Sequence, residues 1–129
     1  MHIILFESQA PKTWDVSTDD YVLWTESAPL CNYPDGDFKI RMSFDWKDQG
    51  WGNQKGRVEI KLISRKGDVL ATEVSPVAPH EWAKYDVTFD SGLDIVSKVV
   101  DGSFYRIFVS TGGGGGHTLT IKNFELTAL

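Results

Sequence analysis

The residues best suited to recognise a ligand stand together after an alternating segment of the chain. They are polar side chains around one glycine-flanked tryptophan: Asp48, Gln49, Trp51, Asn53 and Gln54. Carboxylate and carboxamide groups are planar and can pair with two neighbouring hydroxyls at once. An indole face offers apolar contact to the C–H face of a sugar ring. This combination predicts a saccharide site in which Trp51 stacks on the ring.

Two later loops supply the other candidate ligand-binding residues, which are His80, Gly114 and His117. In an antiparallel meander or jelly roll, successive strands run in opposite directions, so every second loop opens at the same end. Counting strands along the chain therefore predicts that the loops 47–55, 75–81 and 112–116 share one end of the molecule. The loops 27–35, 65–68 and 91–102 are predicted to lie at the opposite end.

Three tryptophans near the first end have different expected environments. Trp46 continues the inward phase of its strand, so we expect it in the core. Trp82 is out of step with Tyr85, which favours packing in the core or at a strand edge over contact with a ligand. Trp51 has few apolar neighbours in its own loop, and the sequence does not decide whether it is exposed.

The five consecutive glycines from Gly112 to Gly116 have two interpretations. They form either a flexible hairpin or a nest of backbone N–H groups that attracts anions, and glycine alone does not establish an anion site. The step Asp48-Gln49-Gly50 is likewise either a simple polar turn or part of the ligand site.

The motifs of common catalytic and metal sites do not occur in the sequence. The three histidines are far apart, and there is no His-Glu-x-x-His, Cys-x-x-Cys, Gly-x-Ser-x-Gly or P-loop pattern. Cys31 has no nearby base in the sequence and is expected to be an inert thiol. The eighteen Asp and Glu residues are more typical of a solvated surface than of an acid–base pair. We therefore expect a non-enzyme with no cofactor and no metal.

The elements that must position these residues are strands. Phe38 to Trp46 alternates apolar and polar residues, which is typical of a strand with one buried face. A tight turn at Arg65 to Asp68 joins two further strands, and Pro76 and Pro79 end the second of them. A change of phase at Lys122-Asn123 predicts a β-bulge in the last strand. The strands are expected at 2–6, 21–25, 38–46, 58–62, 69–74, 85–89, 104–111 and 118–126.

About eight strands without a long helical segment predict an all-β fold, a single antiparallel jelly-roll β-sandwich over residues 1–129. A short connector helix of roughly three turns is expected after Ser91, because Ser91-Gly92-Leu93-Asp94 resembles a capping box. Leu93, Val96 and Val100 would form its apolar stripe, and Gly102 would end it.

Composition and charge exclude several classes of partner. The chain has 129 residues, 41% of them hydrophobic and 24% charged, a balance typical of one globular domain. Its formal net charge of −5 disfavours nucleic acid and anionic membrane as partners. No apolar run approaches the ~20 residues of a membrane-spanning helix, and the N-terminal residues lack the features of a signal peptide. Together with the single cysteine, these features predict a cytoplasmic protein.

The order of three segments resembles the galactose-binding-domain-like jelly rolls, which include many carbohydrate-binding modules and the F-box-associated domains. The segments are 82–89, Tyr-Arg-Ile-Phe-Val at 105–109, and Leu-Thr-Ile-Lys-Asn-Phe-Glu-Leu at 119–126. The resemblance covers nearly the whole chain and implies sugar binding by loops at one end. Many members hold a structural calcium ion, but Asp19-Asp20 and Asp35-Gly36-Asp37 lack the spacing of a calcium loop, so no such site is expected.

The sequence therefore predicts a non-catalytic, lectin-like module that holds a saccharide or a glycoprotein glycan at one loop end. Asp48, Asn53 and Gln54 would exchange hydrogen bonds with the hydroxyls, and His117 would cover one side. Because a shallow site binds weakly, a homo-oligomer would strengthen binding. The alternative is a protein–protein interaction or self-assembly domain in which the same aromatic loop is the hot spot.

Overall fold

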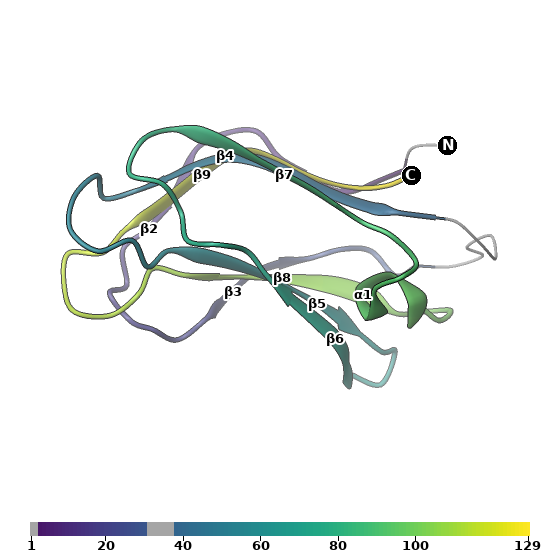
Figure 1. Ribbon diagram of the computed structural model, residues 1–129. Coiled ribbons are helices and arrows are strands. Elements are labelled where there is room, and N and C mark those ends of the chain that lie inside the picture. Colours follow the sequence, from purple (N-terminus) through teal and green to yellow (C-terminus); the bar gives the residue numbers. More distant parts are fainter. Residues whose placement is uncertain (1–2, 31–37) are drawn as a thin grey trace.

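The protein is a two-layer β-sandwich in its computed structural model, which describes residues 3–30 and 38–129 (Figure 1). Nine strands form two antiparallel sheets in this part of the chain. The predicted all-β fold, an antiparallel jelly-roll β-sandwich, is therefore confirmed. The expectations for Cys31 and for Asp35-Gly36-Asp37 fall outside the described residues.

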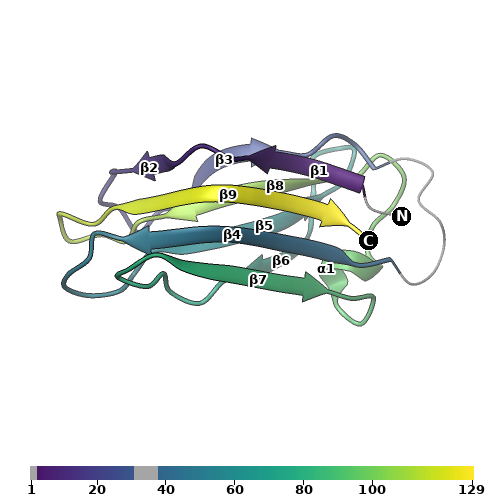
Figure 2. The ribbon, with the colours of Figure 1, turned by 90° about the horizontal axis from the view of Figure 1, so that it is seen from above.

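The first sheet, here called sheet A, contains both ends of the described chain (Figure 2). Its order is β1 (Ile3–Ser8), β9 (Leu119–Ala128), β4 (Ile40–Asp48) and β7 (Ala83–Phe89). A ninth strand that the sequence analysis did not predict, β2 (Lys12–Trp14), pairs with the first part of β9 beside β1. With three residues it is too short to show a periodic pattern.

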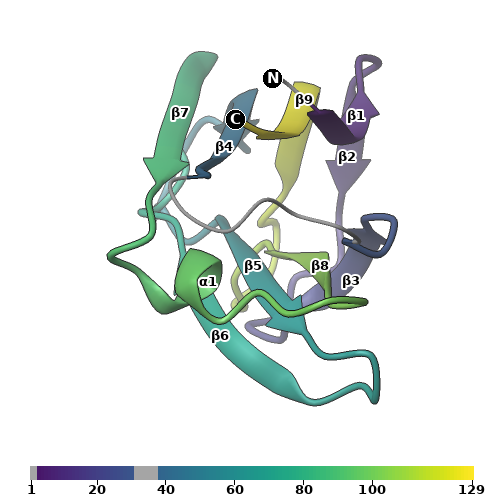
Figure 3. The ribbon, with the colours of Figure 1, turned by 90° about the vertical axis from the view of Figure 1, so that its right-hand side faces the viewer.

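The second sheet, sheet B, lies opposite sheet A in the end-on view of Figure 3. Its order is β3 (Val22–Glu26), β8 (Phe104–Ser110), β5 (Arg57–Ile63) and β6 (Val69–Val74). The hairpin between β5 and β6 turns as predicted, with Gly67 at φ +96° and the Gly67 N–H donating to Ser64 O. A positive φ favours glycine, which explains the residue chosen at this turn.

The core lies between the sheets and is rich in aromatic rings. Phe44 stacks on Phe124, with ring centroids 5.4 Å apart, and Trp46 packs edge-on against Phe44. Trp24 from sheet B closes on Phe124 at 4.7 Å. Trp46 is 3% exposed, so the prediction that it belongs to the core is confirmed. The contact of Trp24 with Phe124 joins the two sheets, and the close packing of these rings holds β4 and β9, from which two of the loops leave.

The predicted bulge in the last strand is confirmed at Asn123. This residue adopts φ +53°, and the register between β4 and β9 shifts between Ser43 and Asp45. The extra residue turns Phe124 into the core after Ile121, although their spacing is odd.

The predicted three-turn helix is wrong. The helix α1 (Asp94–Ser97) has a single turn, and Leu93 caps it without a side-chain hydrogen bond. Leu93 and Val100 are exposed, whereas the adjacent pair Ile95 and Val96 is buried. Two neighbouring buried residues need only one turn, so the chain leaves the helix after Ser97. Gly102 then adopts φ +85° before β8 begins.

In the described ranges, no helix has the length and apolar character needed to cross a bilayer.

Candidate functional site

Four loops meet at one end of the sandwich, at the left in Figure 1. We call this the loop end and define it by the segments 15–21, 48–56, 75–82 and 111–118. Three contacts join the segments: Asp48 N–H donates to Pro79 O at 2.8 Å, Thr118 N–H donates to Gln49 Oε1 at 3.3 Å, and Ala78 N–H donates to Gly56 O at 2.7 Å. The prediction that the loops after β4, β6 and β8 share one end is confirmed.

Asp48 is the buried anchor of the loop end. Its side chain is 1% exposed, and its Oδ1 accepts hydrogen bonds from the Gly50 N–H and from His80 Nδ1, both at 2.8 Å. These bonds tie the loop after β4 to the loop after β6. Asp48 Oδ2 is buried without a hydrogen-bond partner among the described residues. Because Asp48 lies in phase with the buried Trp46, its carboxylate faces the interior rather than the surface.

Gln49 and Gln54 also hold backbone in place. Gln49 Nε2 donates to Trp51 O at 2.7 Å and to Asn53 O at 3.1 Å, so one carboxamide closes the loop that carries Trp51. Gln54 Nε2 donates to Ala78 O at 3.2 Å. Both side chains therefore order the loops, and Gln54 remains exposed enough to offer Oε1 to a ligand.

The glycine loop is clamped from two sides. The Gly113 N–H donates to Asp19 Oδ1 at 2.8 Å, and Gly113 O accepts from Lys55 Nζ at 3.0 Å. Gly112 has φ +84°, and a Cβ there would lie 2.2 Å from Lys55 Cβ. Only glycine fits this approach, because both the backbone conformation and the space exclude a side chain. The run is therefore a held loop in which Gly112 permits close packing.

Trp51 is the most exposed aromatic residue of the loop end. Its side chain is 62% exposed, and the edge of its six-membered ring lies 3.1 Å from the position that a Gly116 Cβ would occupy. The indole therefore rests against the glycine loop while most of its surface faces solvent. Gln49 holds the backbone of the loop from which the ring projects.

The eight sequence-predicted site residues all lie at the loop end, but not all of them reach its surface. Trp51, Asn53, Gln54 and Gly114 are exposed, Gln49 and His80 are half-buried, and Asp48 and His117 are buried. His117 Nδ1 has no hydrogen-bond partner among the described residues. Two residues that the sequence analysis did not select, Asp19 and Lys55, hold the glycine loop. For Lys55 the signal was its place within the candidate loop; for Asp19 there was none.

The expectation that Trp82 packs in the core or at a strand edge is met at the strand edge. Trp82 is 39% exposed and immediately precedes β7, the edge strand of sheet A, so it lies at a strand edge and not in the core. Lys47 and Lys122 both approach its ring, which keeps the indole on the outer face of the sheet.

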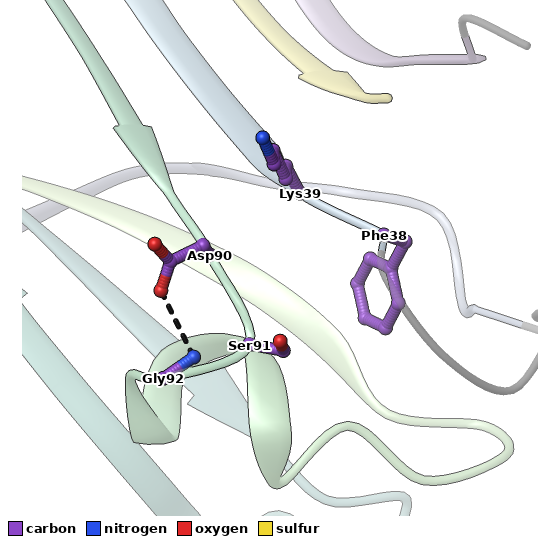
Figure 4. Close-up of a pocket in the computed structure, with 5 residues that line it drawn as sticks. All are labelled: Phe38, Lys39, Asp90, Ser91 and Gly92. Atoms are coloured by element: carbon purple, nitrogen blue, oxygen red, sulfur yellow. Dashed lines mark hydrogen bonds between the residues drawn. The ribbon is translucent and has the colours of Figure 1, made fainter.

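A pocket of about 640 Å³ lies at the other end of the molecule (Figure 4). It is lined by Phe38, Lys39, Asp90, Ser91 and Gly92, and Asp90 Oδ1 accepts from the Gly92 N–H within it. Of these residues only Phe38 is half-buried, and the others are exposed. The pocket is therefore an open depression with one ring and few converging polar groups, which makes it a weaker candidate than the loop end.

The outer face of sheet B is a second candidate surface. Leu23 is 54% exposed there, beside the half-buried Phe108 and Tyr21. Glu59 is 8% exposed although it faces outward, and its Oε1 lies 3.4 Å from Lys61 Nζ. Burial raises the pKa of Tyr21, and the negative charge of Glu59 raises it further while Arg57 opposes the shift. Apolar and charged groups thus alternate across this face.

The described residues contain no group of three His, Cys, Asp or Glu side chains that could hold a metal ion. At the loop end, Asp48 and His80 form a pair, and the third member that a cation would need is missing from this part of the chain.

Comparison with known proteins relates the chain to others by its fold alone. No protein-family model matches the sequence, and no curated protein matches it. Among solved structures, a CBM4 carbohydrate-binding module aligns with a TM-score of 0.56 and 9% identity, covering 99% of this chain and 78% of that one. An arabinose-bound α-L-arabinofuranosidase aligns with a TM-score of 0.47 and 11% identity, covering 95% of this chain and 23% of that one.

Proposed function

We propose that this chain is a non-catalytic carbohydrate-binding module and that the loop end holds the saccharide. The observation that carries the proposal is Trp51, an indole 62% exposed that a closed loop holds against the glycine backbone. An exposed indole presents an apolar face on which the C–H face of a sugar ring can stack. The fold similarity to a CBM4 carbohydrate-binding module supports the same class of ligand.

The polar groups left over after loop closure decide how the saccharide is oriented. The side chain of Asn53 is exposed and can bond to a ligand. His80 Nδ1 is bound to Asp48, which leaves its Nε2 for a ligand. Gln54 offers Oε1 beside them. In this proposal, these three groups exchange hydrogen bonds with hydroxyls, and Asp48 and Gln49 position the loops. A few fixed polar groups beside one ring give orientation with modest affinity.

A neutral-glycan panel tests the proposal directly. The whole chain should bind at least one neutral oligosaccharide, and Trp51→Ala should lower the affinity by about 2 kcal/mol, or roughly thirty-fold. Leu93→Ala is the matched control, since it removes an apolar side chain that is 40% exposed at the other end. Unchanged binding by Trp51→Ala, with loss by Leu23→Asn, would transfer the saccharide to the outer face of sheet B and contradict the assignment to the loop end.

The second candidate is a protein-interaction or self-assembly domain that uses the same exposed indole. An exposed tryptophan is a frequent hot spot of such interfaces. Light scattering with and without saccharide separates the two functions. A saccharide-independent dimer that protects Trp51 from fluorescence quenchers would favour self-assembly, whereas a monomer whose Trp51 is protected only by sugar supports saccharide binding.

A further inference from the structure

Three lysines and one tryptophan lie on the outer face of sheet A, next to the loop end. On β4, Asp45 and Lys47 face outward while Trp46 between them is buried. The pairing of the strands places Asp45 between Lys84 on β7 and Lys122 on β9. We call the set Lys47, Lys84, Lys122 and Trp82 the lysine face.

Trp82 organises the positive charge of this face. The ammonium groups of Lys47 and Lys122 lie 5.0 Å and 4.2 Å from the centroid of its ring. A cation over an indole face is stabilised by about 0.5–1 kcal/mol at an exposed site. The ring therefore draws two lysines from different strands to one point, although their like charges repel.

Within the described residues the lysine face forms no direct ion pair, although Asp45 lies between Lys84 and Lys122. Among residues 3–30 and 38–129, no carboxylate oxygen lies within 4.0 Å of these three ammonium groups. Asp45 accepts a hydrogen bond from Asn123 Nδ2 at 2.9 Å instead. Farther along the same face, Arg41 is paired with Asp86. Three lysines around one carboxylate leave this part of the surface positive on a chain of net charge −5, which marks a place for an anion.

The spacing of the charges favours an extended ligand over a single small anion. Lys84 and Lys122 stand on strands to either side of β4, and neighbouring strands are about 4.8 Å apart. Their charges are therefore distributed across the sheet rather than converging on one pocket. Exposed lysines act as hydrated point charges with little geometric demand, which suits repeated anionic groups along a chain.

We propose that the lysine face binds an acidic polysaccharide that carries carboxylate or sulfate groups. The inference rests on the proposed function only in taking a saccharide as the ligand class, because its residues are separate from Trp51. The segment between Pro79 and Trp82 connects the two surfaces: Pro79 O accepts from Asp48 N–H at 2.8 Å, and Trp82 stands beside Lys47. A long saccharide could therefore contact both surfaces at once.

The test compares dextran sulfate and polygalacturonate, as the anionic probes, with neutral dextran by affinity electrophoresis of the whole chain at low salt. The double variant Lys47→Gln/Lys122→Gln should weaken binding of both anionic probes about tenfold. Lys66→Gln/Lys98→Gln is the control, since it removes the same charge from exposed sites at the other end. Its effect should stay below about twofold, because distant exposed charges are screened by salt.

Two outcomes would overturn the proposal. Equal weakening by both double variants would show that only net charge matters, and equally tight binding of polyadenylate would show that the face does not select a saccharide. Trp51→Ala separates this inference from the proposed function: it should weaken binding of neutral glycans roughly thirty-fold while dextran sulfate binds as before. If the wild-type chain binds dextran sulfate but no neutral glycan, the proposed saccharide site at the loop end is rejected, while the proposal for the lysine face is retained.

Discussion

The two ends of the sandwich are closed in opposite ways. At the loop end, side chains bond to backbone: Asp48 and Gln49 within their own loop, and Lys55 to Gly113 O of the glycine loop. At the helix end, Ile95 and Val96 of α1 are buried, and the Tyr105 hydroxyl donates to Ile95 O at 2.7 Å. Buried apolar side chains close the helix end, so the apolar residues Ile95 and Val96 of α1 are not available to a ligand. Hydrogen bonds close the loop end, and there Trp51 stays exposed to solvent. The comparison shows that polar side chains of a loop site can be used to hydrogen-bond the loop backbone, which leaves fewer of them for a ligand.

The sharpest way to break this comparison is to open the glycine clamp. Gly112→Ala should lower the free energy of unfolding by about 3 kcal/mol, because a Cβ at φ +84° would also lie 2.2 Å from Lys55 Cβ. Gly115→Ala is the matched control, with φ +86° but nothing within 4 Å of the new Cβ, and should cost about 1 kcal/mol. Urea unfolding measures both, and equal costs would argue that the clamp is loose.

At the helix end, Tyr105→Phe removes one buried hydrogen bond without removing the ring. It should lower the free energy of unfolding by about 1.5 kcal/mol, since the Ile95 carbonyl loses its donor in the interior. Affinity for saccharide should not change, because this residue lies at the end opposite Trp51. Thermal unfolding and a binding titration on the same variant check both halves, and a coupled loss of affinity would contradict the separation of the ends.

Gln49→Glu sharpens the distinction between holding a loop and touching a ligand. The carboxylate cannot donate to Trp51 O or Asn53 O, so the loop should open at a cost of about 1 kcal/mol in stability. Saccharide affinity should fall along with it because the Trp51 ring loses its fixed position. Calorimetric titration beside urea unfolding would detect the two effects, and unchanged affinity would mean that loop closure does not position the indole.

The smallest effect is expected between the two ends, on the exposed surface of sheet A. The hydrogen bond from Arg41 holds the pKa of Asp86 below its ordinary value of 3.8, and burial opposes the shift only in part. A lowered pKa in the folded state contributes stability at neutral pH that is lost as the pH falls through that pKa. Asp86→Asn should therefore lower Tm by only about 1 °C at pH 7, because the pair is exposed. This difference should vanish in strong acid, and a constant difference would contradict the assignment.

Strand positions were predictable because alternation records which residues face the core. The bulge at Lys122-Asn123, the turn at Gly67 and the shared end of three loops all followed from phase and parity. The same phase places Asp48 inward beside Trp46, so its burial could have been read from the sequence. The prediction that Asp48 contacts a ligand relied on its residue type and did not take account of its inward position in the strand.

Other features had no local signal in the sequence. Asp19 reaches the Gly113 N–H across 94 positions of the chain, and β2 is three residues long. The helix after Leu93 was overestimated because capping residues predict where a helix begins, not how far it runs; its length is set by the burial of Ile95 and Val96 against the sandwich.

The indole N–H resonances of the tryptophan side chains offer the most direct test of saccharide binding at the loop end. Titration of the ¹⁵N-labelled chain with a neutral oligosaccharide should shift the Trp51 signal first and most. The buried Trp14 and Trp46 should hardly respond. A saturating titration in which the Trp51 signal stays still while another indole moves would contradict the account.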